Sequence, residues 1–249
     1  MGKVVICIDY NIRQYIDHVY NSIKKYTKDF EFYILCDKTI EKTDITYNEK
    51  YKWLFNIDIP EIDINKLNGQ SSIRSKAMFY RFLAPYLIEG DKLIYTDTDV
   101  IFNADIRELW DMDMGDNLIA ATEDQFNHEN KHRPVELQTG ENLEFEGKIY
   151  ASGILIINSK LWREENIITE MIDMYNYYPM LDMLLMNIVC KGRIKELDYN
   201  WCIPANCVKD NYCKKNDRMY NPKCYHWHGP KPWDRYGALK NQLIYEKYL

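Results

Sequence analysis

Short apolar runs alternate with amphipathic helical patterns along the chain, and this alternation constrains the fold more than any other feature. Apolar runs typical of buried strands span residues 4–9, 30–36, 93–96, 118–122 and 154–158. Apolar residues recur at helical spacing over 12–26, 72–87 and 181–189. A chain that alternates in this way is expected to form an α/β fold, with a mostly parallel central sheet and helices on both faces.

The length and composition of the chain suit one folded domain. With 249 residues, of which 46% are hydrophobic, the chain can bury a large core. We expect a single domain over 1–249, made of one half at about 1–115 and a second half at about 116–249. The polar and weakly periodic stretch at 123–147 is expected to be a long loop or a small inserted hairpin.

Charge and cysteine usage restrict the expected partners and compartment. The net charge is −6 and the basic residues are spread along the chain, so we expect no face for nucleic acid. No apolar run reaches the roughly eighteen residues of a membrane span, and the run in MGKVVICIDY is too short for a signal peptide. The seven scattered cysteines fit a reducing environment, so a cytoplasmic protein is expected.

Acidic residues follow two of the expected strands. Asp9 closes the first apolar run, and Asp97 and Asp99 follow the run at 93–96. Ligands of open α/β sheets bind outside the carboxyl ends of the strands, where these side chains would lie. Two carboxylates one residue apart are hard oxygen ligands that suit Mg²⁺ or Mn²⁺ beneath a diphosphate. The alternative for the same motif is an ordinary turn after a strand.

The surrounding sequence resembles a known family. The block SKAMFYRFLAPYLIEGDKLIYTDTDVIFNADIRELWDMDM, which starts at Ser75, is similar to the retaining glycosyltransferases of family eight, the family of glycogenin and the bacterial lipopolysaccharide galactosyltransferases. Four further blocks resemble the family in the same order: ICIDYNIRQYIDHVYNSI, AATEDQF, YASGILIINSKLW and HWHGPKPW. Together the five blocks extend over nearly the whole chain.

The resemblance implies a nucleotide-diphospho-sugar transferase fold of the GT-A type, a UDP-sugar donor, a divalent metal (Mn²⁺ or Mg²⁺) and transfer with retention at the anomeric carbon. In that scheme the first half of the chain binds the nucleotide, and the second half binds the sugar and the acceptor. The implied metal ligands are Asp97, Asp99 and His226. Contacts with the nucleotide and its diphosphate are implied for Ile8, Asp9, Asn11, Thr98, Gly153, Gly229 and Lys231. Contacts with the donor sugar are implied for Arg81, Asp124 and Asp182.

Three of these residues have simpler structural alternatives. Asp9 could act only as a helix N-cap, and Asp182 could act only on a helix dipole. Arg81 lies in an otherwise apolar helical pattern and needs a partner if it is buried. That partner is either a group of the donor or a structural ion pair with Asp97 or Asp124.

The C-terminal block adds an imidazole and an ammonium group. A neutral imidazole at His226 can complete a metal site begun by two carboxylates when its segment folds over the nucleotide. Pro230 and Pro232 stiffen the backbone around Lys231, which can present its charge to phosphate. The alternatives are a packed histidine and an exposed lysine. His228 is expected to take no part.

The chain departs from the family at two places. Many relatives have Phe-Asn-x-Gly where this chain has Tyr150-Ala151-Ser152-Gly153, so an amide that would bond the donor sugar is missing. The family usually has Asp-Gln where this chain has Asp182 followed by Met183, and a thioether cannot act as a nucleophile through an amide oxygen. The two losses indicate either a front-face mechanism without a covalent intermediate or an enzyme that is weakened or altered in its donor.

Two rival classes of function remain. A structural zinc module is one, because cysteines and histidines are dense near the C-terminus, although they lack the usual knuckle spacing. Its candidate ligands are Cys202, Cys207, Cys213, Cys224, His226 and His228. The other is a sugar-nucleotide-binding protein without turnover. The acceptor is expected to be a carbohydrate, a lipid-linked saccharide or a protein, and the sequence leaves a homodimer open.

Overall fold

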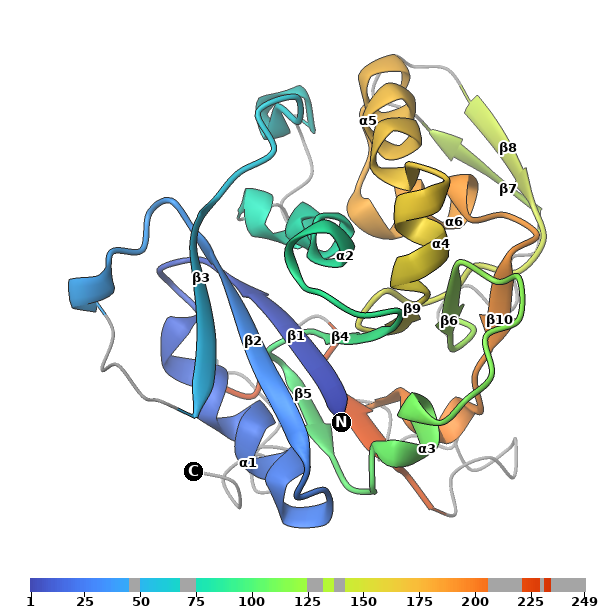
Figure 1. The fold of residues 1–249 in the computed structure, drawn as a ribbon. Coiled ribbons are helices and arrows are strands. Elements are labelled where there is room, and N and C mark those ends of the chain that lie inside the picture. The colour runs from blue at the N-terminus through green and yellow to red at the C-terminus, as the bar shows by residue number, and fades with distance from the viewer. Residues whose placement is uncertain are drawn as a thin grey trace.

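The computed structural model describes residues 1–44, 50–67, 75–124, 132–136, 142–205, 221–228 and 231–233. Its centre is a seven-stranded sheet with the order β10-β6-β9-β4-β1-β2-β3 (Figure 1). The strands of this sheet are β1 (Gly2–Ile8), β2 (Phe30–Asp37), β3 (Tyr51–Ile57), β4 (Leu93–Thr96), β6 (Ile119–Ala121), β9 (Ile154–Ile157) and β10 (Ile194–Glu196). The five apolar runs of the sequence therefore all form strands of one sheet.

The sheet is mostly parallel, as expected, and β9 is the exception. β9 pairs antiparallel with both β4 and β6, whereas the other neighbouring strands are parallel. Parallel neighbours need a crossover connection, usually through a helix. The described chain between β6 and β9 contains a hairpin and no helix, which fits the reversed direction of β9.

Helices cover both faces of the sheet. Each face carries its own hydrophobic core, and the side chains of β1 alternate between the two cores. Val5 and Cys7 belong to one core, and Val4, Ile6 and Ile8 belong to the other. The helix α1 (Ile16–Tyr26) covers the second core. The first core is covered by α2 (Ala84–Leu87), α4 (Ser159–Glu164), α5 (Ile167–Tyr177) and α6 (Asp182–Val189) (Figure 1).

The expected helix at 72–87 is divided in two in the described residues. A 3₁₀ helix, η4 (Lys76–Phe82), starts at Ser75, whose hydroxyl accepts a hydrogen bond from the Ala77 backbone N–H at 3.0 Å. Pro85 lies in the first turn of α2, where its missing N–H costs nothing. The remaining short helices are η1 (Arg13–Tyr15), η2 (Lys42–Asp44), η3 (Ile64–Leu67), α3 (Arg107–Trp110) and η5 (Tyr199–Trp201).

A second, smaller sheet brings the C-terminal part of the chain back to the centre. It has the order β11-β12-β5, with β5 at Val100–Phe102, β11 at Ile203–Pro204 and β12 at Cys224–His226. β12 runs antiparallel to β5, and His226 is paired with Val100. Because β5 begins directly after Asp99, this pairing carries the C-terminal histidine to the acidic motif.

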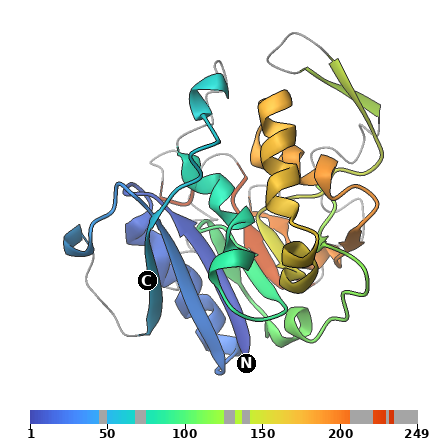
Figure 2. The same cartoon turned by 45° about the horizontal axis from the view of Figure 1, so that its top comes forward.

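The polar stretch at 123–147 was expected to be either a long loop or a small inserted hairpin, and it contains a hairpin. The hairpin pairs β7 (His132–Glu136) with β8 (Asn142–Glu146) and extends away from the central sheet (Figure 2).

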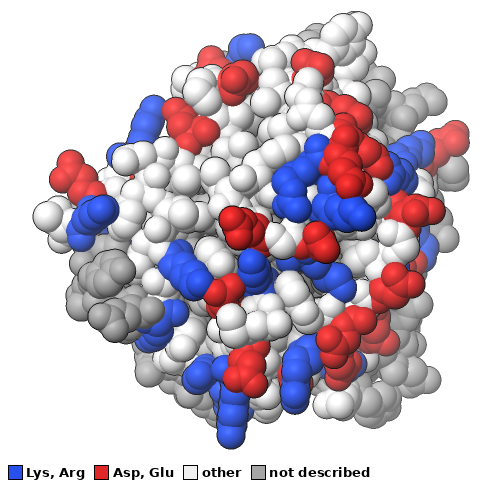
Figure 3. All heavy atoms as spheres, in the orientation of Figure 1, with Lys and Arg blue, Asp and Glu red and all other residues white. Residues whose placement is uncertain are grey.

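The surface and the helices carry two further findings. Acidic and basic side chains are interspersed over the face in Figure 3, which has no continuous basic patch among its described residues. Among the helices that the structure describes, none is both long enough and apolar enough to cross a membrane.

Candidate active site

The acidic motif forms a turn that two other segments hold in place. Asp97, Thr98 and Asp99 connect β4 to β5. The Asp97 backbone N–H donates to the carbonyl of Gly153 at 2.9 Å, just before β9. On the other side, the Trp227 backbone N–H donates to the carbonyl of Asp99 at 3.1 Å, just after β12. The turn is therefore fixed between the start of β9 and the end of β12.

This arrangement brings the three expected metal ligands together. Nε2 of His226 lies 3.3 Å from Oδ1 of Asp99 and 3.6 Å from Oδ2 of Asp97. One ligand atom from each residue lies within 4.8 Å of the other two. Two carboxylate oxygens and one imidazole nitrogen at such separations can converge on a divalent cation.

Gly153 lies against the His226 ring, and no larger residue would fit there. A Cβ atom at position 153 would lie 2.2 Å from Cε1 of His226 and 2.5 Å from its Nδ1. Such distances are far inside van der Waals contact, so any side chain would force the imidazole out of its present position. The glycine that the family resemblance implied at this position thus has a steric reason in this chain.

Lys231 also reaches the acidic turn. Its Nζ contacts Oδ2 of Asp99 and donates to the carbonyl of Trp227 at 3.2 Å. Burial alone would raise the pKa of Asp99, but His226 and Lys231 hold it well below its ordinary value. Burial alone would lower the pKa of His226, yet the charge of Asp99 raises it well above the ordinary value. Asp99 thus lies between the imidazole of His226 and the ammonium group of Lys231.

Arg81 is buried at the centre of a second set of contacts. Its Nη2 lies 3.1 Å from Oδ1 of Asp97 and 3.2 Å from Oδ2 of Asp182. Its Nη1 donates to the carbonyl of Ser152 at 2.6 Å, and its guanidinium carbon lies 4.2 Å from the centre of the Tyr95 ring. The structural ion pair with Asp97 that the sequence left open is present, and the second acidic partner is Asp182.

Asp182 lies on the first turn of α6, beside the acidic turn. Burial raises the pKa of Asp182, while the charge of Arg81 opposes that rise. Asp124, only 4% exposed, follows β6, and its backbone N–H donates to the carbonyl of Ile149 at 2.7 Å. Arg81 and Asp182 are thus joined to the acidic turn directly, and Asp124 is placed by the backbone pairing that follows β6.

Asp9 and Asn11 lie at the carboxyl end of β1. Oδ1 of Asp9 accepts hydrogen bonds from the backbone N–H groups of Asn11 at 2.8 Å and Ile12 at 3.2 Å. These bonds close a turn after β1 and do not form the helix N-cap that the sequence offered as an alternative, because the N-cap residues of η1 and α1 are Ile12 and Tyr15, with no side-chain cap bond at either. Ile8, the last residue of β1, is fully buried in the core, and Thr98 is buried within the acidic turn. Gly229 lies outside the described residues.

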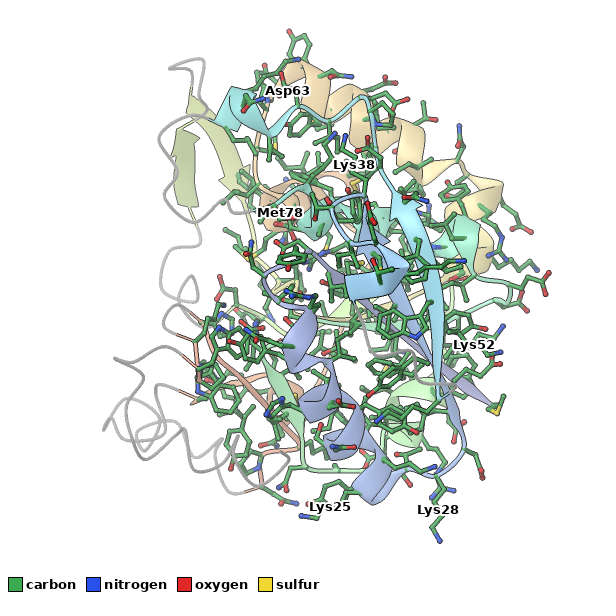
Figure 4. The ribbon with its side chains drawn as sticks, turned by 90° about the vertical axis from the view of Figure 1, so that its left-hand side faces the viewer. Lys25, Lys28, Lys38, Lys52, Asp63 and Met78 are labelled. Carbon is green, nitrogen blue, oxygen red and sulfur yellow. The ribbon has the colours of Figure 1, made fainter. Side chains whose placement is uncertain are left out.

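A cavity of about 510 Å³ opens beside this end of the sheet. Its lining residues include Asp9, Asn11, Asp37, Lys38 and Tyr80. In the view of Figure 4, Lys38 and Met78 are labelled in the upper half of the molecule, whereas Lys25 and Lys28 lie at its lower end. The cavity is therefore at the carboxyl ends of β1 and β2, where the sequence places a ligand. Asp37 and Lys38, at the end of β2, were not predicted as site residues because that strand end carries no motif of its own, and Tyr80, on η4, was placed in a helix without a role.

Asn187 is a buried residue of the site region that the sequence analysis missed. From α6, its Oδ1 accepts from the Tyr150 backbone N–H at 2.7 Å and its Nδ2 donates to the Tyr150 carbonyl at 2.8 Å. These two bonds hold the segment that leads into Ser152 and Gly153. A single amide side chain in an apolar helix was the signal that could have indicated this role.

Some of the residues considered for a zinc module also gather. Cys202, His226 and His228 each offer a ligand atom within 4.8 Å of the others. Sγ of Cys202 lies 3.5 Å from Nδ1 of His226 and 4.0 Å from Nε2 of His228. Cys207 and Cys213 lie outside the described residues. The His226 ring therefore belongs to two clusters, one with carboxylates and one with a thiol.

Comparison with known proteins gives a family match over most of the chain. The model of glycosyl transferase family 8 matches residues 3–237. The chain is also 30% identical, over 220 residues, to general stress protein A of Bacillus subtilis (strain 168), which covers 79% of this chain and 71% of that protein.

Solved structures of sugar transferases have the same fold. The galactosyltransferase LgtC, solved with donor and acceptor sugar analogues, superposes with a TM-score of 0.71 at 20% identity and covers 98% of this chain and 95% of its own. The bifunctional glycosyltransferase WbbM also gives a TM-score of 0.71 at 20% identity and covers 99% of this chain. This chain spans only about half, 51%, of the WbbM chain.

Proposed function

Because this chain belongs to glycosyl transferase family 8 and has the GT-A fold, it is a glycosyltransferase, and we propose that it is a retaining hexosyltransferase that uses a UDP-sugar donor. Glucose or galactose is the proposed sugar, and a glycan, a lipid-linked saccharide or a protein is the proposed acceptor. The observation that carries the proposal is the cluster of Asp97, Asp99 and His226 at the carboxyl end of β4.

The donor atoms of this cluster fit a divalent cation, with Mn²⁺ or Mg²⁺ as the proposed ion. Carboxylate oxygens suit these hard ions, and imidazole is an accepted additional ligand. Gly153 supports the fit, because only a residue without Cβ lets the imidazole approach the carboxylates. When bound, the cation supplies Lewis-acid stabilisation of the charge that develops on the departing diphosphate.

Basic side chains of the site are proposed to share this work. Lys231 contacts Asp99 and is placed to turn its ammonium group to a phosphate oxygen once a cation holds that carboxylate. Gly229 is proposed to approach the diphosphate in the same segment. Asp9 and Asn11 line the cavity at the carboxyl ends of β1 and β2, and we assign uridine to this cavity.

The sugar is assigned to the region around Arg81, Asp124 and Asp182. Asp182 is buried against Arg81 and can accept hydrogen bonds from sugar hydroxyl groups with its remaining lone pairs. Met183 follows it and has no atom that can attack the anomeric carbon. We therefore propose a front-face reaction: the bond between sugar and UDP loosens, the acceptor oxygen bonds the same face, and the acceptor proton passes to the leaving phosphate oxygen.

The test is release of UDP from UDP-glucose and UDP-galactose, with and without Mn²⁺. We expect metal-dependent release in the wild type and a loss of about 100-fold or more in Asp99→Asn, because a ligand and a charge are removed. Asp173→Asn is the control, because Asp173 is exposed on α5 and its substitution removes the same charge away from the acidic turn.

Two outcomes would contradict the proposal. Equal release by the wild type and Asp99→Asn would remove the acidic turn from the mechanism. Binding of UDP-sugar without release by the wild type would identify a sugar-nucleotide-binding protein, consistent with the changes at Ala151 and Met183. A trapped covalent glycosyl-enzyme would overturn the front-face path alone.

A further inference from the structure

The His226 ring has a different set of ligand atoms on each side. Its Nε2 faces the carboxylates, 3.3 Å from Oδ1 of Asp99. Its Nδ1 faces the opposite way, 3.5 Å from Sγ of Cys202. One imidazole therefore lies between hard oxygen ligands and a soft thiol.

The thiol side has the spacing of a zinc site. With zinc–sulfur bonds of about 2.3 Å and zinc–nitrogen bonds of about 2.0 Å, a tetrahedral ion separates its sulfur and nitrogen ligands by roughly 3.5 Å. The separation of Cys202 Sγ from His226 Nδ1 is 3.5 Å, and its separation from His228 Nε2 is 4.0 Å. Small side-chain adjustments would bring all three atoms to one ion.

The backbone explains why these three side chains meet. Ile203 and Pro204 of β11 pair with Tyr225 and His226 of β12, so Cys202 enters beside β12. His228 follows two residues after the end of β12, and its ring centroid lies 4.0 Å from that of His226. Cys202 and His226 are both buried, at 2% and 6% exposure, and the cluster is thus part of the fold.

The chemistry of this set differs from that of the acidic turn. A thiolate with two imidazoles favours zinc and similar thiophilic ions, whereas two carboxylates with one imidazole suit Mn²⁺ and Mg²⁺. Zinc also lies well above manganese in general affinity for nitrogen and sulfur ligands. The two sets should therefore select different ions from the same solution.

We propose that Cys202, His226 and His228 form a second metal site for a thiophilic divalent ion such as Zn²⁺, and that its occupation withdraws His226 from the carboxylate site. A neutral imidazole offers one lone pair, because its other ring nitrogen carries the proton. When Nδ1 binds zinc, Nε2 no longer serves a cation held by Asp97 and Asp99. The thiol-containing metal site does not depend on the proposed function, whereas the competition for His226 rests on it.

The first experiment uses Co²⁺ as a spectroscopic probe for zinc. Cobalt bound to a thiolate gives a charge-transfer absorption band, whereas cobalt bound only to carboxylates and imidazoles does not. We expect the band in the wild type and in Asp99→Asn, its loss in Cys202→Ser, and its persistence in Cys190→Ala, which removes a buried thiol of α6's C-cap. Absence of the band in the wild type, or its full retention in Cys202→Ser, would overturn the thiol site.

The second experiment measures Mn²⁺ binding from the electron paramagnetic resonance of the free ion. In the wild type, one equivalent of Zn²⁺ should weaken Mn²⁺ binding by about tenfold or more. Loss of even a group that only supports a metal ligand lowers metal affinity by about 10-fold to 100-fold. In Cys202→Ser the same addition should have much less effect. Equal displacement in both proteins would refute the competition. Failure of Mn²⁺ to bind at all would refute the proposed function and the competition, while the cobalt band would still decide the thiol site.

Discussion

At the scale of single residues, Gly153 and His226 show how little space the site allows. A Cβ at position 153 would lie 2.2 Å from Cε1 of the imidazole, and the neighbouring backbone is held by its bond to Asp97. The ring would have to rotate or withdraw, because the backbone of β9 and β12 is fixed by strand pairing.

Gly153→Ala should therefore weaken Mn²⁺ binding by about tenfold or more, through displacement of one ligand. Gly2→Ala is the matched control, because its Cβ would lie 3.5 Å from the nearest atom of Trp110, an ordinary contact. Calorimetric titration with Mn²⁺ measures both, and circular dichroism checks that each variant is folded. Unchanged affinity in folded Gly153→Ala would show that His226 is not a ligand.

The sequence predicted that several of the candidate site residues lie together, but it predicted few of their contacts. Asp97, Asp99 and His226 do come together: the motif after β4 places the two carboxylates, and the pairing of β12 with β5 brings the imidazole to them. The sequence left Asp97 and Asp124 open as ion-pair partners of Arg81 and did not indicate Asp182, because the contact of η4 with the start of α6 is non-local. Cys202 was considered only as part of a zinc module, because its distance from His226 depends on how β11 pairs with β12.

At the scale of elements, α6 fixes the segment before β9 through one side chain. Asn187→Ala would leave the Tyr150 N–H and carbonyl without their partner inside the protein. The free energy of unfolding should fall by about 1–3 kcal/mol, the cost of unpaired buried polar groups. Urea unfolding measures the change, with Asp173→Ala on α5 as a control expected to stay within about 0.5 kcal/mol. A loss no larger than that of the control would contradict the role of Asn187.

A second element-scale contact joins the end of α1 to the start of α3. Oδ1 of Asp105 accepts from the Thr27 hydroxyl at 2.8 Å and from the Arg107 backbone N–H at 2.9 Å, and Arg107 Nε bonds Oδ2 at 2.7 Å. The Arg107 hydrogen bonds, above all, lower the pKa of Asp105 from 3.8 to about 2.

Asp105→Asn should consequently reduce the free energy of unfolding by on the order of 1 kcal/mol at pH 7, a figure reduced for solvent screening. A depressed carboxyl pKa contributes stability that is complete above the unfolded value of 3.8 and is lost as the pH falls through about 2. The difference between wild type and variant should therefore narrow between these values. Urea unfolding as a function of pH measures it, and a difference that does not change with pH would contradict the assignment.

Periodicity predicted five strands of the central sheet and the helices α1 and α6, but it did not predict β3, β10, α4 or α5, and it failed where pairing is non-local. The strands at β1, β2, β4, β6 and β9 follow from apolar runs. The short strands β5, β11 and β12 were not predicted, because two or three residues show no period and form only when distant segments meet. The direction of β9 was likewise not assigned, since an apolar run has no direction in a sheet.

At the scale of the whole molecule, the site joins distant parts of the chain, so occupation of the site should stabilise the entire fold. Mn²⁺ and UDP at about 100 times their dissociation constant should raise the free energy of unfolding by about 2.7 kcal/mol. For a chain of this size that corresponds to a rise in Tm of roughly 5–10 °C. Differential scanning fluorimetry should show this rise in the wild type and little of it in Asp99→Asn. An equal rise in both would indicate binding away from the acidic turn.

The pairing of β12 with β5 also affects when the protein becomes active during its synthesis. Lys231 and Asp99 are 132 residues apart, and the imidazole reaches the acidic turn only through β12. A ribosome has therefore made both carboxylates long before it adds the residues that complete their site. Under the proposed function, an unfinished chain would hold neither the cation nor the nucleotide firmly, and incomplete translation products would consume no activated sugar.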